Sequence, residues 1–174
     1  MIRMSRFPVP AALAAVFLLA GCGGGPQARS AHPVIAPEAM VSAIRAAPGD
    51  ADGELAVQPL RDPRVEDLRA EAERLEAAGD VAGAARALDQ ALAVVDNDPA
   101  LLQERAELAV LQQDFALAAQ LAERAYALGA QVGPLCRRHW TTLEQLRLRT
   151  GDADGAASAR AQVEACRVTG PERY

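Results

Sequence analysis

The hydrophobic pattern of the chain changes at Pro63. From there onward apolar residues recur at the spacing of amphipathic helices, and no stretch alternates as a β-strand does. Short polar breaks separate the helical stretches, and aspartates follow three of them, at Asp80, Asp114 and Asp152. A side chain of this kind accepts hydrogen bonds from the first backbone N–H groups of the next helix. The pattern therefore predicts an all-α domain made of helical pairs.

The helical pairs repeat with a period of 34 residues. Six positions of the first copy recur in the second, where Leu68, Ala72, Gly79, Asp80, Ala84 and Ala91 become Leu102, Ala106, Gln113, Asp114, Ala118 and Ala125. After a four-residue insertion, a third copy is marked by Trp140, Gly151, Asp152, Ala156 and Val163. Prolines, which the first turn of a helix tolerates, stand at or just before the start of each pair, at Pro63, Pro99 and Pro134. We expect a helical domain at 63–168, with repeats at about 64–97, 98–131 and 136–168, and a tail at 169–174.

A period of this length with small residues at fixed positions resembles the tetratricopeptide repeat. The segments that carry the resemblance are AGDVAGAARALDQAL, QQDFALAAQLAERAY and WTTLEQLRLRTGDADGAASARAQV. The resemblance implies about three repeats stacked as a short solenoid, with Phe115 and Trp140 packed in the core. It also implies close helix crossings at the small positions Ala84, Ala91, Ala118, Ala125 and Ala156. A long hairpin or coiled coil is the alternative fold, but the Gly-Asp and Asn-Asp-Pro breaks interrupt the sustained period that it needs.

The third repeat departs from the pattern. Glu144 occupies a position that is normally small, and Arg147 and Arg160 replace apolar residues. Either this hairpin is tilted, or one of its faces is left open to solvent or to a partner.

The N-terminus predicts export. Arg3 and Arg6 precede an apolar run at 9–20 that is too short to span a bilayer, which is typical of a signal peptide at 1–21. The sequence Leu19-Ala20-Gly21-Cys22 resembles the lipobox of bacterial lipoproteins, which implies acylation of Cys22 and cleavage before it. No aspartate follows Cys22. We therefore expect a lipid anchor in the cell envelope, at the periplasmic face of the outer membrane; a soluble secreted protein is the alternative.

Residues 22–62 are rich in Gly, Pro and Ala without a sustained period, which predicts a disordered, flexible tether. Within the tether, AMVSAIRAA at 39–47 has the pattern of a marginal helix that is too short to form unless it packs against something.

Charge excludes some partners. The chain has 18 basic and 23 acidic residues, and every basic residue is an arginine. This acidic balance argues against binding to nucleic acid and against electrostatic docking on anionic lipid. The membrane link should therefore be the acyl chains.

Cys136 and His139 lie three residues apart on one predicted helix. In the repeat framework Cys136 begins the third hairpin and Cys166 ends it, so the resemblance implies a disulfide between them. A cysteine- or metal-dependent enzyme centred on Cys136 and His139 is the alternative, although a zinc site would be one ligand short. We expect a partly exposed His139, no catalytic residues, no metal and no cofactor.

Arrays of this family present the first helices of their repeats as a concave groove. By repeat position this groove should bind a protein or peptide segment through Glu66, Arg69, Glu73, Gln103, Glu107, Arg138, Thr141, Gln145 and Arg149. We therefore predict a non-enzymatic interaction adaptor, and reversing the charges of Arg138 and Arg149 should leave thermal stability nearly unchanged. A structural spacer with no ligand in the groove is the alternative.

Overall fold

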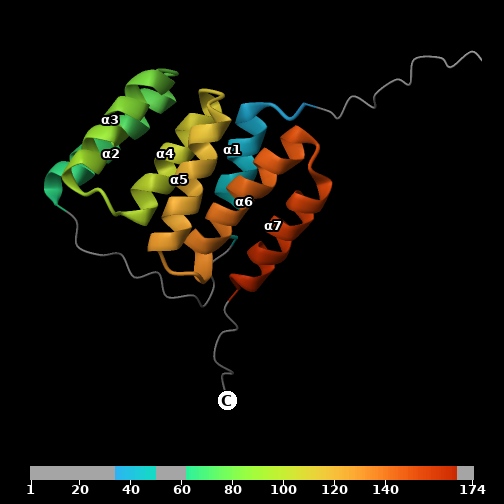
Figure 1. Ribbon diagram of the computed structural model, residues 1–174. Helices are drawn as coiled ribbons and strands as arrows, with labels where there is room; N and C mark the ends of the chain where they lie inside the picture. The colour runs from blue at the N-terminus through green and yellow to red at the C-terminus, as the bar shows by residue number, and fades with distance from the viewer. Residues whose placement is uncertain (1–33, 50–61, 168–174) are drawn as a thin grey trace, which may run out of the picture. The chain divides into compact units, whose positions relative to one another are not determined.

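A computed structural model describes residues 34–49 and 62–167, and every regular element in those two ranges is an α-helix (Figure 1). The all-α prediction is thereby confirmed. The predicted signal peptide, Cys22 and the tail at 169–174 lie outside the described residues. The seven helices of these ranges are α1 (Pro37–Ala46), α2 (Pro63–Ala77), α3 (Val81–Val94), α4 (Pro99–Leu111), α5 (Phe115–Leu128), α6 (Gly133–Thr150) and α7 (Ala153–Ala165).

Helices α2 to α7 form three hairpins that stack in sequence order, as Figure 1 shows. The second helix of each hairpin begins where the sequence predicts. Asp80 accepts a hydrogen bond from the Gly83 backbone N–H at 2.7 Å, and equivalent bonds of 3.0 and 2.9 Å follow Asp114 and Asp152. Each cap satisfies an N–H group that has no partner within the helix, so the aspartates fix where α3, α5 and α7 start.

The turn inside each hairpin needs a left-handed backbone conformation. Gly79 and Gly151 supply it with φ values of 83° and 76°, whereas the second hairpin places Gln113 there with a φ of 61°. A residue with a Cβ is strained in this region, by roughly 1 kcal/mol relative to glycine. Gln113 therefore adopts the same turn conformation as Gly79, 34 residues earlier, although it is not a glycine.

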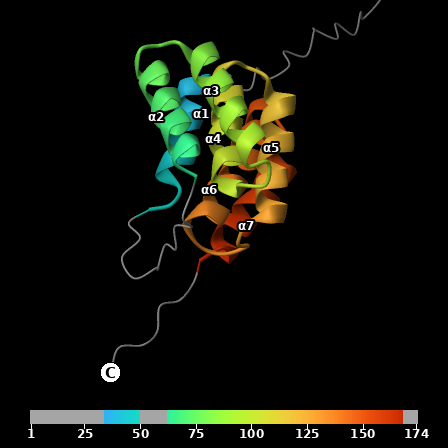
Figure 2. The ribbon, with the colours of Figure 1, turned by 90° about the vertical axis from the view of Figure 1, so that its left-hand side faces the viewer.

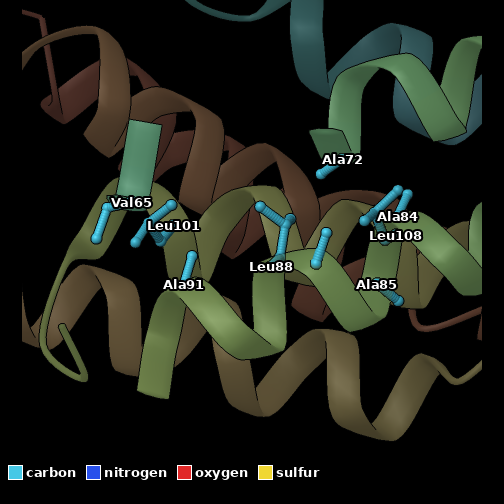
Figure 3. Close-up of a cluster of buried hydrophobic side chains, with 9 residues drawn as sticks. Val65, Ala72, Ala84, Ala85, Leu88, Ala91, Leu101 and Leu108 are labelled. Carbon is cyan, nitrogen blue, oxygen red and sulfur yellow. The ribbon is translucent and has the colours of Figure 1, made fainter. Parts of the chain in front are cut away.

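The first two hairpins pack through small and branched apolar residues. Ala84 and Ala91 are fully buried on α3, and Val65, Leu88 and Leu101 join them from α2, α3 and α4 (Figure 3). The full burial of both alanines agrees with small residues being needed here, since a larger side chain would have to push the paired helices apart.

The third hairpin is joined partly by polar contacts. The charged residues that depart from the repeat pattern each have a hydrogen-bond partner in the same hairpin. The Arg160 Nε donates to Glu144 Oε1 at 2.8 Å, which joins α7 to α6. The Arg147 Nη1 donates to the Gly155 carbonyl at 2.8 Å across the same pair. The charged residues therefore join the two helices of this hairpin by one ion pair and one hydrogen bond to the backbone.

Helix α1 corrects the predicted tether at 22–62. Met40 and Ile44 are fully buried and Val41 is nearly so, in a cluster with Ala109, Val110 and Leu146 of α4 and α6. Figure 2 shows α1 on the side of α2, α4 and α6, away from α5. A ten-residue helix is not stable alone, but burial of three side chains against α4 and α6 stabilises it. The folded domain therefore begins well before Pro63.

Candidate interaction surface

The first helices of the three hairpins share one face of the molecule, and α1 covers part of it. Helix α1 contacts α4 and α6, while no backbone contact joins it to α2 within the described ranges. The face therefore has a covered half, under α1, and an open half beside α2.

Three of the predicted groove residues lie beneath α1 or in the interface between α4 and α6, which we call the α4–α6 seam. Gln103 and Glu107 are fully buried and Thr141 is nearly so. The prediction that these positions line an open groove is therefore wrong, because the packing of α4 against α6 and of α1 against both helices covers them. Glu107 instead accepts hydrogen bonds from Arg45 Nε at 2.9 Å and from Arg138 Nη2 at 2.7 Å, so one carboxylate joins α1, α4 and α6.

A hydrogen-bonded chain continues from Glu107 into the seam. The Gln103 Nε2 donates to Glu107 Oε1 and to Thr142 Oγ1, each at 2.9 Å. The Gln103 Oε1 lies 2.7 Å from His139 Nδ1. An amide oxygen can only accept, which assigns the imidazole proton to Nδ1.

His139 is fully buried, so the expectation of a partly exposed residue is wrong. Burial, together with the positive charge of Arg138, lowers the pKa of His139 to about 4. The side chain is therefore neutral at pH 7, where it donates one hydrogen bond to Gln103 and packs in the seam.

The two ends of α1 are also held by arginines of α6. The Arg149 Nη1 donates to the Ile35 carbonyl at 3.0 Å, and its guanidinium lies 4.2 Å from the centre of the Phe115 ring. Arg137 donates to the Pro48 carbonyl at the other end. Charge reversal at Arg138 and Arg149 would break the Glu107 pair and the Arg149 contacts with Ile35 and Phe115. The premise that neither arginine takes part in the packing of the domain is therefore wrong, and we now expect the reversal to lower stability.

The open half of the face contains Glu66, Arg69 and Glu73, three predicted groove residues of α2. The Arg69 Nε donates to Glu104 Oε2 at 2.9 Å and its Nη1 to Glu66 Oε2 at 3.3 Å, while Glu73 is exposed. Gln145 is half-buried on α6. A hollow of about 530 Å³ lies here. Its apolar floor is Ala72, Leu88 and Leu108, and its charged rim is Arg45, Arg69, Glu73, Glu76, Glu104 and Arg138.

The cysteines do not form the nucleophile or metal site of the alternative interpretation. Cys136 and Cys166 are joined as a buried disulfide with their Cα atoms 5.7 Å apart, at the open end of the third hairpin. Cys136 therefore carries no thiol in this structure, and His139 faces Gln103 instead. Within residues 34–49 and 62–167, no three His, Cys, Asp or Glu side chains are grouped to hold a metal ion.

Two further observations bear on the chemistry of the domain. Trp140 packs edge-on against Tyr126 with ring centroids 5.1 Å apart, so its aromatic ring joins α6 to α5. None of the helices in the described part of the chain combines the length and the apolar character that crossing a membrane requires.

The chain is similar to a solved structure of the globular C-terminal domain of P. aeruginosa LpoP. The two share 29% sequence identity with a TM-score of 0.56, over 60% of this chain and 99% of that one. No protein-family model matches the chain, and no curated protein matches it. The likeness supports the helical fold of the whole matched domain.

Proposed function

We propose that the chain is a lipid-anchored cell-envelope protein of the tetratricopeptide type, acting as a non-enzymatic adaptor that binds a protein segment on its concave face. The observation that carries the proposal is the open hollow beside α2, which has an apolar floor and a charged rim. Pockets of this kind seat an apolar side chain and orient it by polar groups. The similarity to a C-terminal domain of a bacterial protein agrees with this layout, in which the helical domain follows a lipobox-like N-terminus.

The rim indicates a ligand that carries positive charge. Each rim arginine already hydrogen-bonds a glutamate: Arg69 pairs with Glu104, Arg45 with Glu76, and Arg138 with Glu107. Glu73 is exposed at the edge of the same hollow. A partner side chain with an aliphatic stem and a cationic head would cover Leu88 and Leu108 and approach Glu73.

A photo-crosslinker at position 77 tests the adaptor role in cells, because Ala77 is exposed and lines the hollow beside Glu73. It should yield a defined crosslinked partner, whereas the same crosslinker at the exposed Glu123 on α5 should not. Adding Glu73→Arg should reduce the yield at position 77 severalfold, since it replaces the carboxylate that the ligand approaches with a positive charge. Equal yields at positions 77 and 123 would show that the hollow binds no partner.

The anchor is tested separately. Cys22→Ser should abolish incorporation of radiolabelled fatty acid and leave the precursor uncleaved, because the acylated sulfur is the expected signal for processing. Fractionation should place the unaltered protein with the outer membrane. Normal maturation of the Cys22→Ser chain would refute the lipoprotein proposal without affecting the crosslinking result.

A further inference from the structure

We infer that the concave face binds an extended, basic segment of a partner protein along the gap between α1 and α2, where two hollows lie side by side. The segment places one cationic side chain in each hollow, with the two cationic residues four positions apart. This inference rests on the proposed adaptor function. It adds a second hollow, built partly by α1, to the hollow already described, and it specifies the spacing of the charges on the ligand.

The second hollow lies between α1 and the turn that joins α2 to α3, and its volume of about 530 Å³ equals that of the first. Its α1 side is a single helix face, because the lining positions recur at the spacing of neighbours on a helix surface. Its lining residues are Glu38, Val41, Ser42, Arg45, Glu76, Val81 and Leu111. Val81 and Leu111 are only partly buried, so this hollow also has an apolar floor that a ligand can reach.

The ion pair between Arg45 and Glu76 separates the two hollows. Both residues line each hollow, and the Arg45 Nη1 and Nη2 donate to the Glu76 carboxylate at 2.8 and 3.0 Å. A helical ligand, about 10–12 Å wide with its side chains, would have to break this pair to reach the apolar floor. An extended chain can cross above the pair and insert one side chain on each side of it. The two hollows therefore fit an extended segment.

The charges that line the hollows favour a basic ligand. Three arginines and four glutamates line the two hollows together, and the buried Glu107 also binds Arg45 and Arg138. Glu38 and Glu73 are exposed, and within residues 34–49 and 62–167 neither accepts a hydrogen bond or forms a salt bridge. Each hollow thus presents one carboxylate to a cation from outside, beside apolar side chains that would cover the aliphatic stem of an arginine or lysine.

The helices set the distance between these two carboxylates. Arginines of α6 bind the carbonyls at both ends of α1 and hold it antiparallel to α6. Alternate helices of the stacked hairpins point the same way, so α1 is also antiparallel to α2. Glu38 lies seven residues before Arg45 and Glu73 lies three residues before Glu76, so the two carboxylates lie in opposite directions from the ion pair.

The spacing of the ligand follows from this arrangement. At about 1.5 Å per helical residue, the two steps along α1 and α2 add to roughly 15 Å. An extended chain covers that length in four or five residues, at about 3.3 Å per residue. Alternate side chains of an extended chain share one face, so a spacing of four directs both cationic side chains to the floor.

The test uses the chain from residue 22 onward with Cys22→Ser, and labelled peptides of serine and alanine that carry two arginines. At low salt, a peptide with arginines at positions i and i+4 should bind severalfold more tightly than a peptide of the same composition with arginines at i and i+1. Neighbouring side chains of an extended chain point to opposite faces, so the second peptide fills one hollow only. In NMR spectra the first peptide should shift the methyl signals of Leu108 and Leu111, which line the first and second hollows.

Charge-neutral variants separate the two hollows. Glu38→Gln and Glu73→Gln should each weaken binding of the i and i+4 peptide severalfold, and the double variant should weaken it by about the product of the two effects, because distant sites act independently. Both side chains are exposed, so these variants should keep the fold. Glu123→Gln makes the same change of charge at an exposed position of α5 and should leave the affinity unchanged.

Equal affinities for the two peptides would overturn the inference, and this comparison uses the chain without further substitution. An effect of Glu38→Gln no larger than that of Glu123→Gln would also overturn it. If Glu73→Gln still weakened binding in that case, the first hollow and the proposed function would stand without the second hollow. Absence of a crosslink at position 77 in cells would instead refute the adaptor role, whichever peptide binds.

Discussion

The two interfaces between neighbouring hairpins, or seams, differ in the kinds of side chain that they bury. The seam between the first two hairpins is apolar, with Val65, Leu88 and Leu101 packed around fully buried alanines. The seam between α4 and α6 contains a buried carboxylate, an amide and an imidazole, joined by hydrogen bonds that begin at Glu107 and end at His139. Ion pairs such as Arg69 with Glu104 lie at the edge of the first seam, beside the open hollow, but only the second seam has a carboxylate, an amide and an imidazole that are fully buried.

The difference between the seams separates two properties of the domain, its stability and the dependence of that stability on pH. Apolar contacts are non-directional and do not respond to pH, so the first seam supplies stability alone. A buried polar network fixes one register and makes stability depend on protonation, because each member needs its partner. The seam between α4 and α6, on which α1 packs, is therefore the one that responds to solution conditions.

The largest expected effect lies in the apolar seam. Leu101→Ala should lower the free energy of unfolding by about 3 kcal/mol, since it removes a fully buried side chain and leaves a cavity. Urea denaturation at pH 7 and pH 5 should give the same loss. The control Leu128→Ala, at a side chain that is 47% exposed, should change stability by less than about 0.5 kcal/mol.

The next largest effect is a pH dependence of the free energy of unfolding, caused by His139 in the α4–α6 seam. The pKa of His139 is about 4 in the folded chain and about 6.5 when unfolded, so between these values the unfolded chain binds a proton that the folded chain does not. Stability should therefore fall by about 2 kcal/mol between pH 7 and pH 5, and this contribution should level off below pH 4.

The control for this prediction is His139→Gln, which should flatten the pH dependence in that window whatever its own cost in stability. The exposed carboxyl of Asp62, whose hydrogen bonds to Arg64 lower its pKa to about 2, acts only at lower pH. A wild-type chain equally stable at pH 7 and pH 5 would show that His139 is not the buried neutral group described above.

The smallest effect tests one hydroxyl of the network. Thr142→Val keeps the shape of a fully buried side chain but removes a hydroxyl that accepts from Gln103 Nε2 at 2.9 Å and donates to the Arg138 carbonyl at 3.0 Å, and it should cost about 1 kcal/mol. Thr150→Val, at an exposed hydroxyl, should cost much less. If the two variants behaved alike in urea denaturation, the network would be adding nothing beyond its packing.

The sequence predicts the hairpins well because local signals and the repeat period agree. Aspartate caps, small residues at close crossings and the 34-residue spacing each indicate the same boundaries. Gln113 shows that the period can dominate a local preference, since it adopts the left-handed turn conformation that glycine adopts in the other two hairpins.

The sequence does not predict the site equally well, and the reason is α1. AMVSAIRAA has a helical pattern but is too short to be helical on local grounds, so only tertiary burial decides its structure. With α1 packed on α4 and α6, Glu107 is a core residue that binds Arg45 of α1 and Arg138 of α6, and Arg149 binds the carbonyl of Ile35 just before α1. No local pattern in α4 or α6 indicates that a distant segment covers them.

The seating of α1 also sets how far the domain can travel from its anchor. With Cys22 held in a bilayer as proposed, the first seated helix begins at Pro37, and a chain of that length spans at most about 50 Å. Without the packing of α1, the first residue held by the hairpins would be Pro63, and the maximum span would be about 140 Å. The burial of three side chains of α1 thus shortens the reach of the hairpins by more than half, with no change in the hairpins themselves.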